Sequence, residues 1–429
     1  MITILIVVFL SFLLYYFLYY KKPSIFVHPN IAQVTFFRDY LLLTLIPYIY
    51  YIYDNNYKIH YILKQIHSNY VISQAAIHAF VFMFMFLISF KILNVSFKKS
   101  IKNININVNI KKVIQMTNTF SILLIIYFIL VSINYSAGII GLLKYNLTEL
   151  NFLRHHLEHG DSFLQFNKTV IQNWIPMTSY LLYYLYLKKY LYRYYQKQIL
   201  IIMIILGILA SIFFFEKSVI FFYFMGLVGV YIYTGNKLNK KLVLAIPFLA
   251  IFLVAMMYTL VYQDKILDNQ YLIDILIHRS TTQCVGSIMA IEYFVSHDIM
   301  GYAGVSNLWA NVLGTSFQSP YAFLIDYYVP ESAELSGALS SFAVGEAFAL
   351  FGYIGVFLSG IIVAIYYAFL ESSKHSLFTS IIFVPLYGVY FSHFYIASGF
   401  YSFVWPVGLV LVLFPFIVIV LLSVKYRRM

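Results

Sequence analysis

The sequence predicts an all-α polytopic membrane protein with about eleven transmembrane helices. Of its 429 residues, 62% are hydrophobic and 10% are charged, whereas charged residues make up about a quarter of an ordinary soluble domain. Apolar runs such as 2–19, 71–90 and 404–424 reach the roughly 20 residues with which a helix crosses a bilayer. These runs lack the alternation of a transmembrane β-strand. The chain is therefore expected to form a single integral membrane domain.

The apolar runs and the breaks between them give the candidate spans. Lysine and arginine concentrate in the loops after odd-numbered spans, and such loops remain in the cytoplasm. The N-terminus is therefore expected outside and the C-terminus inside, and the net charge of +12 implies no nucleic-acid partner. The expected spans are 2–19, 36–53, 71–92, 113–135, 169–187, 199–215, 219–234, 243–262, 341–367, 377–396 and 404–424.

Two of the expected outer loops are long, 136–167 and 263–340. The second contains eight acidic residues, and its only lysine and arginine are Lys265 and Arg279. The scarcity of positive charge places this loop outside. Cys284 is the only cysteine, so an intramolecular disulfide is impossible.

Ionisable residues within or beside apolar segments are candidates for function, because charge inside a membrane is costly. Glu346 and His393 fall near the outer ends of two spans, and Lys217 falls at the outer tip between two others. Arg38 and Asp39 are expected at the cytoplasmic mouth of a span instead. A core histidine and a solvated turn are the alternative interpretations of His393 and Lys217. The shared depth of the outer groups predicts a polar cavity open to one side, whereas a proton-coupled carrier needs such groups along a path through the midplane.

The first outer loop carries the run Arg154-His155-His156-Leu157-Glu158-His159. On a helix His155 and His159 would share a face, but a structural metal site uses four ligands, and no metal is expected. The other two interpretations are a solvated turn at the membrane interface and an anion site formed by Arg154 with a neighbouring histidine.

The second outer loop begins with a predicted helical stretch, 272–294. Arg279 follows Leu272, Ile275 and Leu276 at helical spacing, so it projects from the apolar face. Such an arginine either extends to lipid headgroups or holds a phosphate, which its planar fork suits.

Aromatic residues follow in the same loop, where they form an interfacial belt or stack on sugar rings. No GxSxG, P-loop, GxGxxG or CxxC spacing occurs, so hydrolase, nucleotide-hydrolysing and redox functions have no support. The aromatic residues are Trp309, Phe317, Tyr321, Tyr327 and Tyr328.

This layout resembles the bacterial oligosaccharide repeat-unit polymerases, the Wzy-type O-antigen and capsule polymerases. Gly345-Glu346, followed by the aromatic-Gly-x-x-Gly segment at 351–355, is similar to the clearest local pattern of that family. Glu216-Lys217-Ser218 between two spans is similar to another recurring piece.

The resemblance implies a C-type glycosyltransferase in the bacterial inner membrane, with its active site facing the periplasm. The substrates would be a growing glycan on undecaprenyl pyrophosphate as donor and a single lipid-linked repeat unit as acceptor. The other implied partners are membrane lipids and a chain-length regulator protein. No cofactor is implied, because the glycosyl pyrophosphate is already activated. An O-antigen ligase and a flippase or transporter of lipid-linked oligosaccharides are the alternatives.

Such a transfer needs cations to hold the pyrophosphate leaving group and a base within reach of the attacking hydroxyl. The expected catalytic residues are Glu346, which is the preferred base, and Glu292 and His156, which are the next candidates. The expected pyrophosphate ligands are Arg154, Arg279 and Lys217, and His393 is a further candidate.

Overall fold

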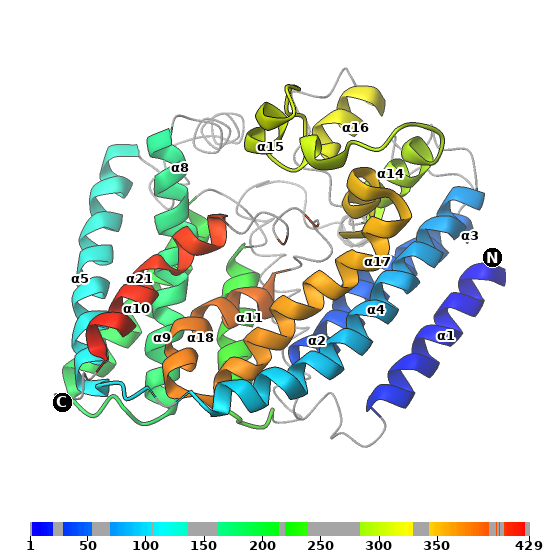
Figure 1. Ribbon diagram of the computed structural model, residues 1–429. Helices are drawn as coiled ribbons and strands as arrows, with labels where there is room; N and C mark the ends of the chain where they lie inside the picture. Colours follow the sequence, from blue (N-terminus) through cyan, green and yellow to red (C-terminus); the bar gives the residue numbers. More distant parts are fainter. Residues whose placement is uncertain are drawn as a thin grey trace, which may run out of the picture.

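The computed structural model of the chain describes nine stretches and two single residues, and these are helical apart from turns, loops and an isolated β-bridge between Val108 and Val424 (Figure 1). Five helices are long and apolar enough to cross a membrane, so the chain is a helical membrane protein. They are α1 (Ile2–Tyr19), α4 (Asn69–Lys102), α5 (Ile110–Tyr135), α10 (Tyr194–Ile212) and α17 (Ala343–Ser372). The described residues are 2–19, 29–53, 69–104, 106–135, 162–213, 219–238, 284–328, 343–393, 400, 403 and 407–424.

Shorter helices complete the body. Each predicted span that falls within the described stretches overlaps a helix, while the predicted span 243–262 lies outside them. The number of membrane crossings stays a prediction. The shorter elements are α2 (Ile31–Thr35), η1 (Phe36–Leu45), α3 (Ile46–Tyr53), α8 (Ser162–Thr169), η3 (Val170–Trp174), α9 (Ile175–Leu187), α11 (Val219–Tyr233), α14 (Val285–Ser296), η5 (Gly301–Gly304), α15 (Asn307–Val312), α16 (Pro320–Tyr328), η7 (Ser373–His375), α18 (Leu377–Ser392) and α21 (Val407–Ser423).

The pair α4 and α17 forms the central contact of one half of the molecule (Figure 1). The two helices run parallel, since His78 of α4 stacks on Phe348 of α17 and, nearer their other ends, Asn94 accepts a hydrogen bond from Ser372. Between these contacts the backbones come very close, because a β-carbon at Gly360 would lie 2.5 Å from the carbonyl oxygen of Phe82. Small residues that let backbones approach are a usual basis of helix packing in membranes.

Replacing Gly360 by valine is expected to destabilise the protein by about 1–3 kcal/mol, because the added side chain must push α4 away from α17. Thermal unfolding in detergent measures this effect. Leu358→Val on the same helix is the matched control, since Leu358 is 44% exposed. Equal unfolding temperatures for the two variants would contradict the close approach at Gly360.

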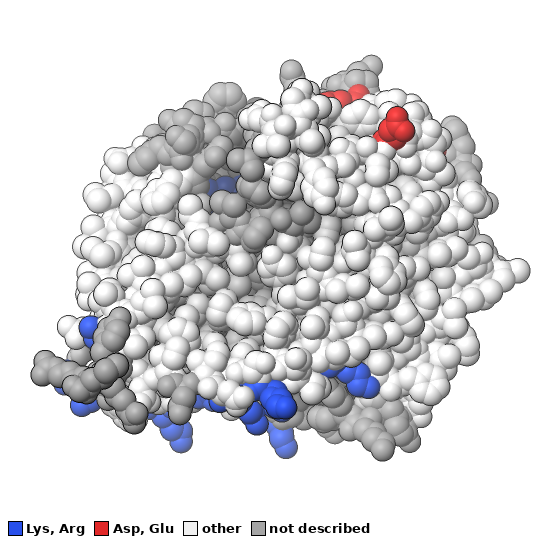
Figure 2. All heavy atoms as spheres, viewed as in Figure 1, with Lys and Arg blue, Asp and Glu red and all other residues white. Residues whose placement is uncertain are grey.

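Charges of opposite sign lie at opposite ends of the helical body. Figure 2 shows most of the visible lysine and arginine side chains along its lower edge and the visible acidic side chains near its top. We call these the basic end, where α4 ends with Lys98 and Lys102 and α5 begins with Lys111, and the acidic end, which contains α14 with Glu292 and α16 with Asp326. Helices α14, α15 and α16 gather at the acidic end (Figure 1).

The expected position of Arg38 and Asp39 at the mouth of a span is wrong. The helical segment begins at Ile31, five residues before the predicted span, because Asn30 and Gln33 form a capping box that satisfies the first backbone amides. Arg38 therefore lies about two turns inside the segment, and its guanidinium contacts the carbonyl of His393. Arg38 and His393 therefore lie at the same level, although the sequence predicted them at opposite sides of the membrane.

The helix that was predicted at 272–294 is described only from Val285, as α14. Eight of its twelve residues are buried, and it packs on α4 and α17. This part of the predicted outer loop therefore belongs to the helical body. Residues 263–283, including Arg279, lie outside the described stretches.

Candidate functional site

Glu346 lies in the first turn of α17 and is only 2% exposed. Its Oε2 accepts a hydrogen bond from the backbone N–H of Phe400, and an acidic side chain at this position is stabilised by the helix dipole. The preceding Gly345 lets α14 approach, because a β-carbon there would lie 2.5 Å from Cα of Ser287. The Ser287 hydroxyl is 2.6 Å from the Tyr48 hydroxyl of α3. The turn that carries Glu346 is thus held between α14 and the backbone at Phe400.

The segment that follows contains the aromatic-Gly-x-x-Gly pattern and a sharp kink of α17. Gly352 has φ 62° and ψ −149°, a backbone conformation essentially restricted to glycine. After the kink, a β-carbon at Gly355 would lie 2.2 Å from the carbonyl oxygen of Ala347. The carbonyl of Ala349 accepts a hydrogen bond from the backbone N–H of Met300, at 2.9 Å. The two glycines therefore set the direction of the turns that hold Glu346.

His393 follows the last residue of α18. Its Nδ1 lies 3.0 Å from the Ser392 hydroxyl and 3.2 Å from the carbonyl oxygen of Val389. The imidazole packs against Phe222 of α11, with 4.7 Å between ring centroids. The ring is thus held at the end of α18, and its role toward pyrophosphate stays a prediction.

Arg38 binds the backbone beside this histidine. Its Nε and one terminal nitrogen donate to the carboxylate of Asp39 in a two-point contact. The remaining hydrogens go to the carbonyl oxygens of Phe391, Ser392 and His393. The sequence around Arg38 does not indicate this contact, because the carbonyls that it binds lie more than 350 residues away in the chain.

Glu292, the second candidate base, lies on α14 at the acidic end. It accepts a hydrogen bond of 2.9 Å from the hydroxyl of Tyr328 on α16. Burial raises the pKa of Tyr328, and the hydrogen bond and negative charge of Glu292 raise it further. The phenol therefore remains a donor throughout the physiological pH range. Glu292 ties α16 to α14, whereas Glu346 binds the backbone at Phe400.

The variant Tyr328→Phe is expected to destabilise the acidic end by about 1.5–3 kcal/mol, because a partly buried carboxylate loses its donor. Thermal unfolding at pH 7 measures the loss. Tyr327→Phe is the control, since Tyr327 is 56% exposed. A similar loss in both variants would show that the hydrogen bond to Glu292 contributes little.

Exposed aromatic rings surround the acidic end. Tyr302 and Trp309 face each other, with centroids 5.6 Å apart, and are 57% and 39% exposed. Tyr327 of α16 packs edge-on against Tyr293 of α14. The two interpretations drawn from the sequence, an interfacial belt and a surface that stacks on sugars, stay predictions.

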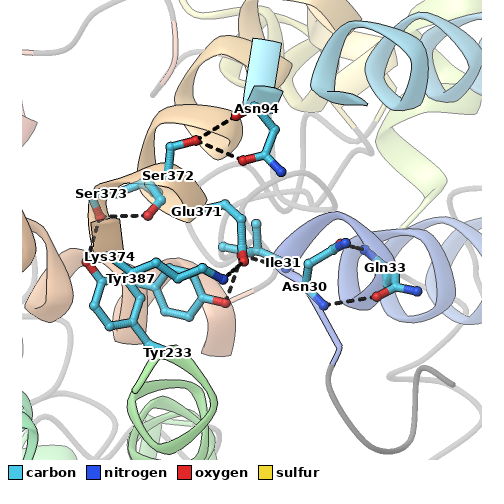
Figure 3. Close-up of polar contacts among 11 residues, drawn as sticks. Asn30, Ile31, Gln33, Asn94, Tyr233, Glu371, Ser372, Ser373, Lys374 and Tyr387 are labelled. Carbon is cyan, nitrogen blue, oxygen red and sulfur yellow. Dashed lines mark hydrogen bonds and ion pairs between the residues drawn. The ribbon is translucent and has the colours of Figure 1, made fainter. Parts of the chain in front are cut away.

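The second buried glutamate of α17, Glu371, lies near the basic end of that helix, and nothing in the sequence singles it out (Figure 3). Its Oε2 accepts the Tyr387 hydroxyl of α18 at 3.1 Å and the backbone N–H of Ile31 at 3.3 Å. Lys374 forms an ion pair with its other oxygen. Glu371 thereby joins α2, α17 and α18, and these satisfied contacts indicate a structural junction.

Four of the expected site residues, Arg154, His156, Lys217 and Arg279, lie outside the described stretches. Within those stretches no group of three metal-ligand side chains occurs. Comparison with known proteins gives no relative for this chain, since no family model, no curated protein and no solved structure matches it.

Proposed function

We propose that the chain is a membrane-embedded glycosyltransferase that polymerises oligosaccharide repeat units linked to undecaprenyl pyrophosphate. The acidic end would face the periplasm of a bacterial inner membrane, where the product would be O-antigen or capsular polysaccharide. The proposal rests on the resemblance of Gly345-Glu346 and 351–355 to the polymerase pattern and on the site around them.

The observation that carries the proposal is the placement of Glu346. A carboxylate that is 2% exposed in the first turn of a long apolar helix is costly to bury, and this cost makes it a candidate for function. It belongs to a helix whose first turns adjoin α14, the helix of Glu292, near the exposed aromatic rings of Tyr302 and Trp309. The opposite end of the body is basic (Figure 2), and basic loops favour the cytoplasm.

In the proposed reaction Glu346 accepts the proton of the attacking sugar hydroxyl. The hydroxyl oxygen forms a bond to the anomeric carbon of the donor, and the bond from that carbon to the pyrophosphate oxygen breaks. Arg154, Arg279 and Lys217 would hold the pyrophosphate as it gains charge, with His393 in support. No nucleotide or metal is required to activate the donor.

The test is an analysis of lipid-linked glycans in a strain that lacks this gene. Single repeat units exposed to the periplasm are expected to accumulate, and wild-type protein is expected to restore polymer. Long polymer that stays on the lipid carrier would instead identify a ligase.

A flippase or transporter is the second candidate, and one observation favours it. Arg38 and Asp39 lie beside His393 inside the helical body and Glu371 lies nearer the basic end, so ionisable groups occur at more than one level, as a path through the membrane requires. Hydrogen bonds and ion pairs within the protein already satisfy all five guanidinium hydrogens of Arg38 and both carboxylate oxygens of Glu371, which favours structural roles. In the deletion strain, repeat units that remain inaccessible to an added periplasmic glycosidase would support the transporter.

A further inference from the structure

The end of α18 is bound by a single side chain. The last carbonyl groups of a helix lack donors within the helix and carry partial negative charge. Here the carbonyl oxygens of Phe391, Ser392 and His393 all accept from the guanidinium of Arg38. Ser392 is 1% exposed, so the last residue of α18 is buried within the protein.

Asp39 fixes the orientation of this guanidinium. It is fully buried, with 0% exposure, and both its oxygens accept from Arg38. Nε of Arg38 donates one hydrogen bond and each of the two terminal nitrogens donates two, so every N–H of the guanidinium has an acceptor. The planar guanidinium of arginine suits such a set of acceptors, whereas the ammonium group of lysine does not.

The chain is held again at Phe400, seven residues after His393. Its backbone N–H donates to Glu346. At His393 and the two residues before it, the cation Arg38 binds backbone carbonyl groups, which carry partial negative charge. At Phe400, the anion Glu346 binds a backbone N–H group, which carries partial positive charge. Arg38 and Glu346 therefore hold the two sides of the same stretch of chain.

We propose that Arg38, oriented by Asp39, is a positioning residue of the site, which sets the end of α18 and His393 relative to Glu346. This proposal rests on the proposed glycosyltransferase function. Arg38 itself is not assigned to bind pyrophosphate, because its hydrogens are engaged by the protein.

A positioning role predicts a specific kinetic pattern. Turnover in Arg38→Lys is expected to fall about 10- to 100-fold, while KM for the lipid-linked donor changes less than about twofold, since a residue that does not touch substrate alters geometry more than binding. Arg193→Lys is the control, because Arg193 is exposed and directly precedes α10 as its N-cap. Rescue by lysine to wild-type turnover would overturn the proposal, because a point charge would then suffice.

A second variant distinguishes a loss of positioning from misfolding. Removing Arg38 alone leaves the Asp39 charge unpaired, which is strongly destabilising, whereas replacing both partners by apolar residues is often tolerated. Arg38→Met combined with Asp39→Leu is therefore expected to fold but to lose turnover as Arg38→Lys does.

The position of α18 is measured separately, by thiol labelling that needs no activity. Cys284 is fully buried and is replaced by alanine, and Ser392→Cys supplies the single thiol. Its reaction with N-ethylmaleimide is expected to be slow with Arg38 present and at least about tenfold faster in the double variant, because local opening governs the access of reagents to buried groups.

Faster labelling together with lower turnover supports the proposal. Unchanged labelling overturns it, and so does faster labelling with wild-type turnover, which would leave Arg38 a purely structural cap. If the protein with Arg38 intact shows no polymerisation while labelling still responds to the double variant, the proposed function fails and the contact of Arg38 with α18 stands.

Discussion

The variant Glu346→Gln is expected to abolish glycan elongation while leaving the protein folded. Glutamine keeps the shape of the side chain, and its carbonyl oxygen can accept the Phe400 N–H as the carboxylate does. It cannot accept a proton at neutral pH. Loss of a positioned base typically costs about 10²- to 10⁴-fold in rate, so elongation of lipid-linked repeat units by purified protein is expected to fall below detection, with donor binding retained.

Glu371→Gln is the matched control for this experiment. Both glutamates lie on α17 and are buried, with 2% and 4% exposure, but Glu371 belongs to the junction near the basic end (Figure 3). Elongation is expected to survive in Glu371→Gln. Near-normal chains from Glu346→Gln, with inactivity of Glu292→Gln, would move the role of base to Glu292.

The sequence predicted the helices well because the signal for them is local. The composition and the runs 2–19 and 71–92 identified α1 and α4, whose ends are within a few residues of the predicted ones, apart from the basic tail of α4. The helical segment starts at Ile31, five residues before the predicted span, because the capping box of Asn30 and Gln33 begins the helix ahead of the long apolar run.

Prediction of the site was limited by long-range contacts. Glu346 could be singled out as a carboxylate within an apolar run, but its partner Phe400 is 54 residues away. Arg38 was set aside because nothing near it in sequence reveals the carbonyls at the end of α18. Glu371 escaped notice for the same reason, since it is joined to Ile31 across 340 positions.

The kink at Gly352, in the aromatic-Gly-x-x-Gly segment, sets the direction of the first turns of α17 and so permits the long-range contacts of Glu346. Glu346 lies six residues before Gly352, on the part of α17 that precedes the kink. Without the kink the Ala349 carbonyl would accept from within the helix, and the contact with Met300 would be lost. A straight α17 would therefore direct its first turns away from α14 and from Phe400.

Gly352→Ala is accordingly expected to remove most elongation activity and to destabilise the protein by about 1–3 kcal/mol, the usual cost of this backbone region for a residue with a β-carbon. Gly235→Ala separates the two effects. Gly235 also has a positive φ, 90°, but follows α11 at the basic end, and a β-carbon there would meet nothing within 4 Å. Comparable losses of unfolding temperature are expected, with activity lost only in Gly352→Ala. Equal activities in the two variants would mean that the kink does not hold Glu346 in its working position, and the site would then have to be built from α14 and Glu292.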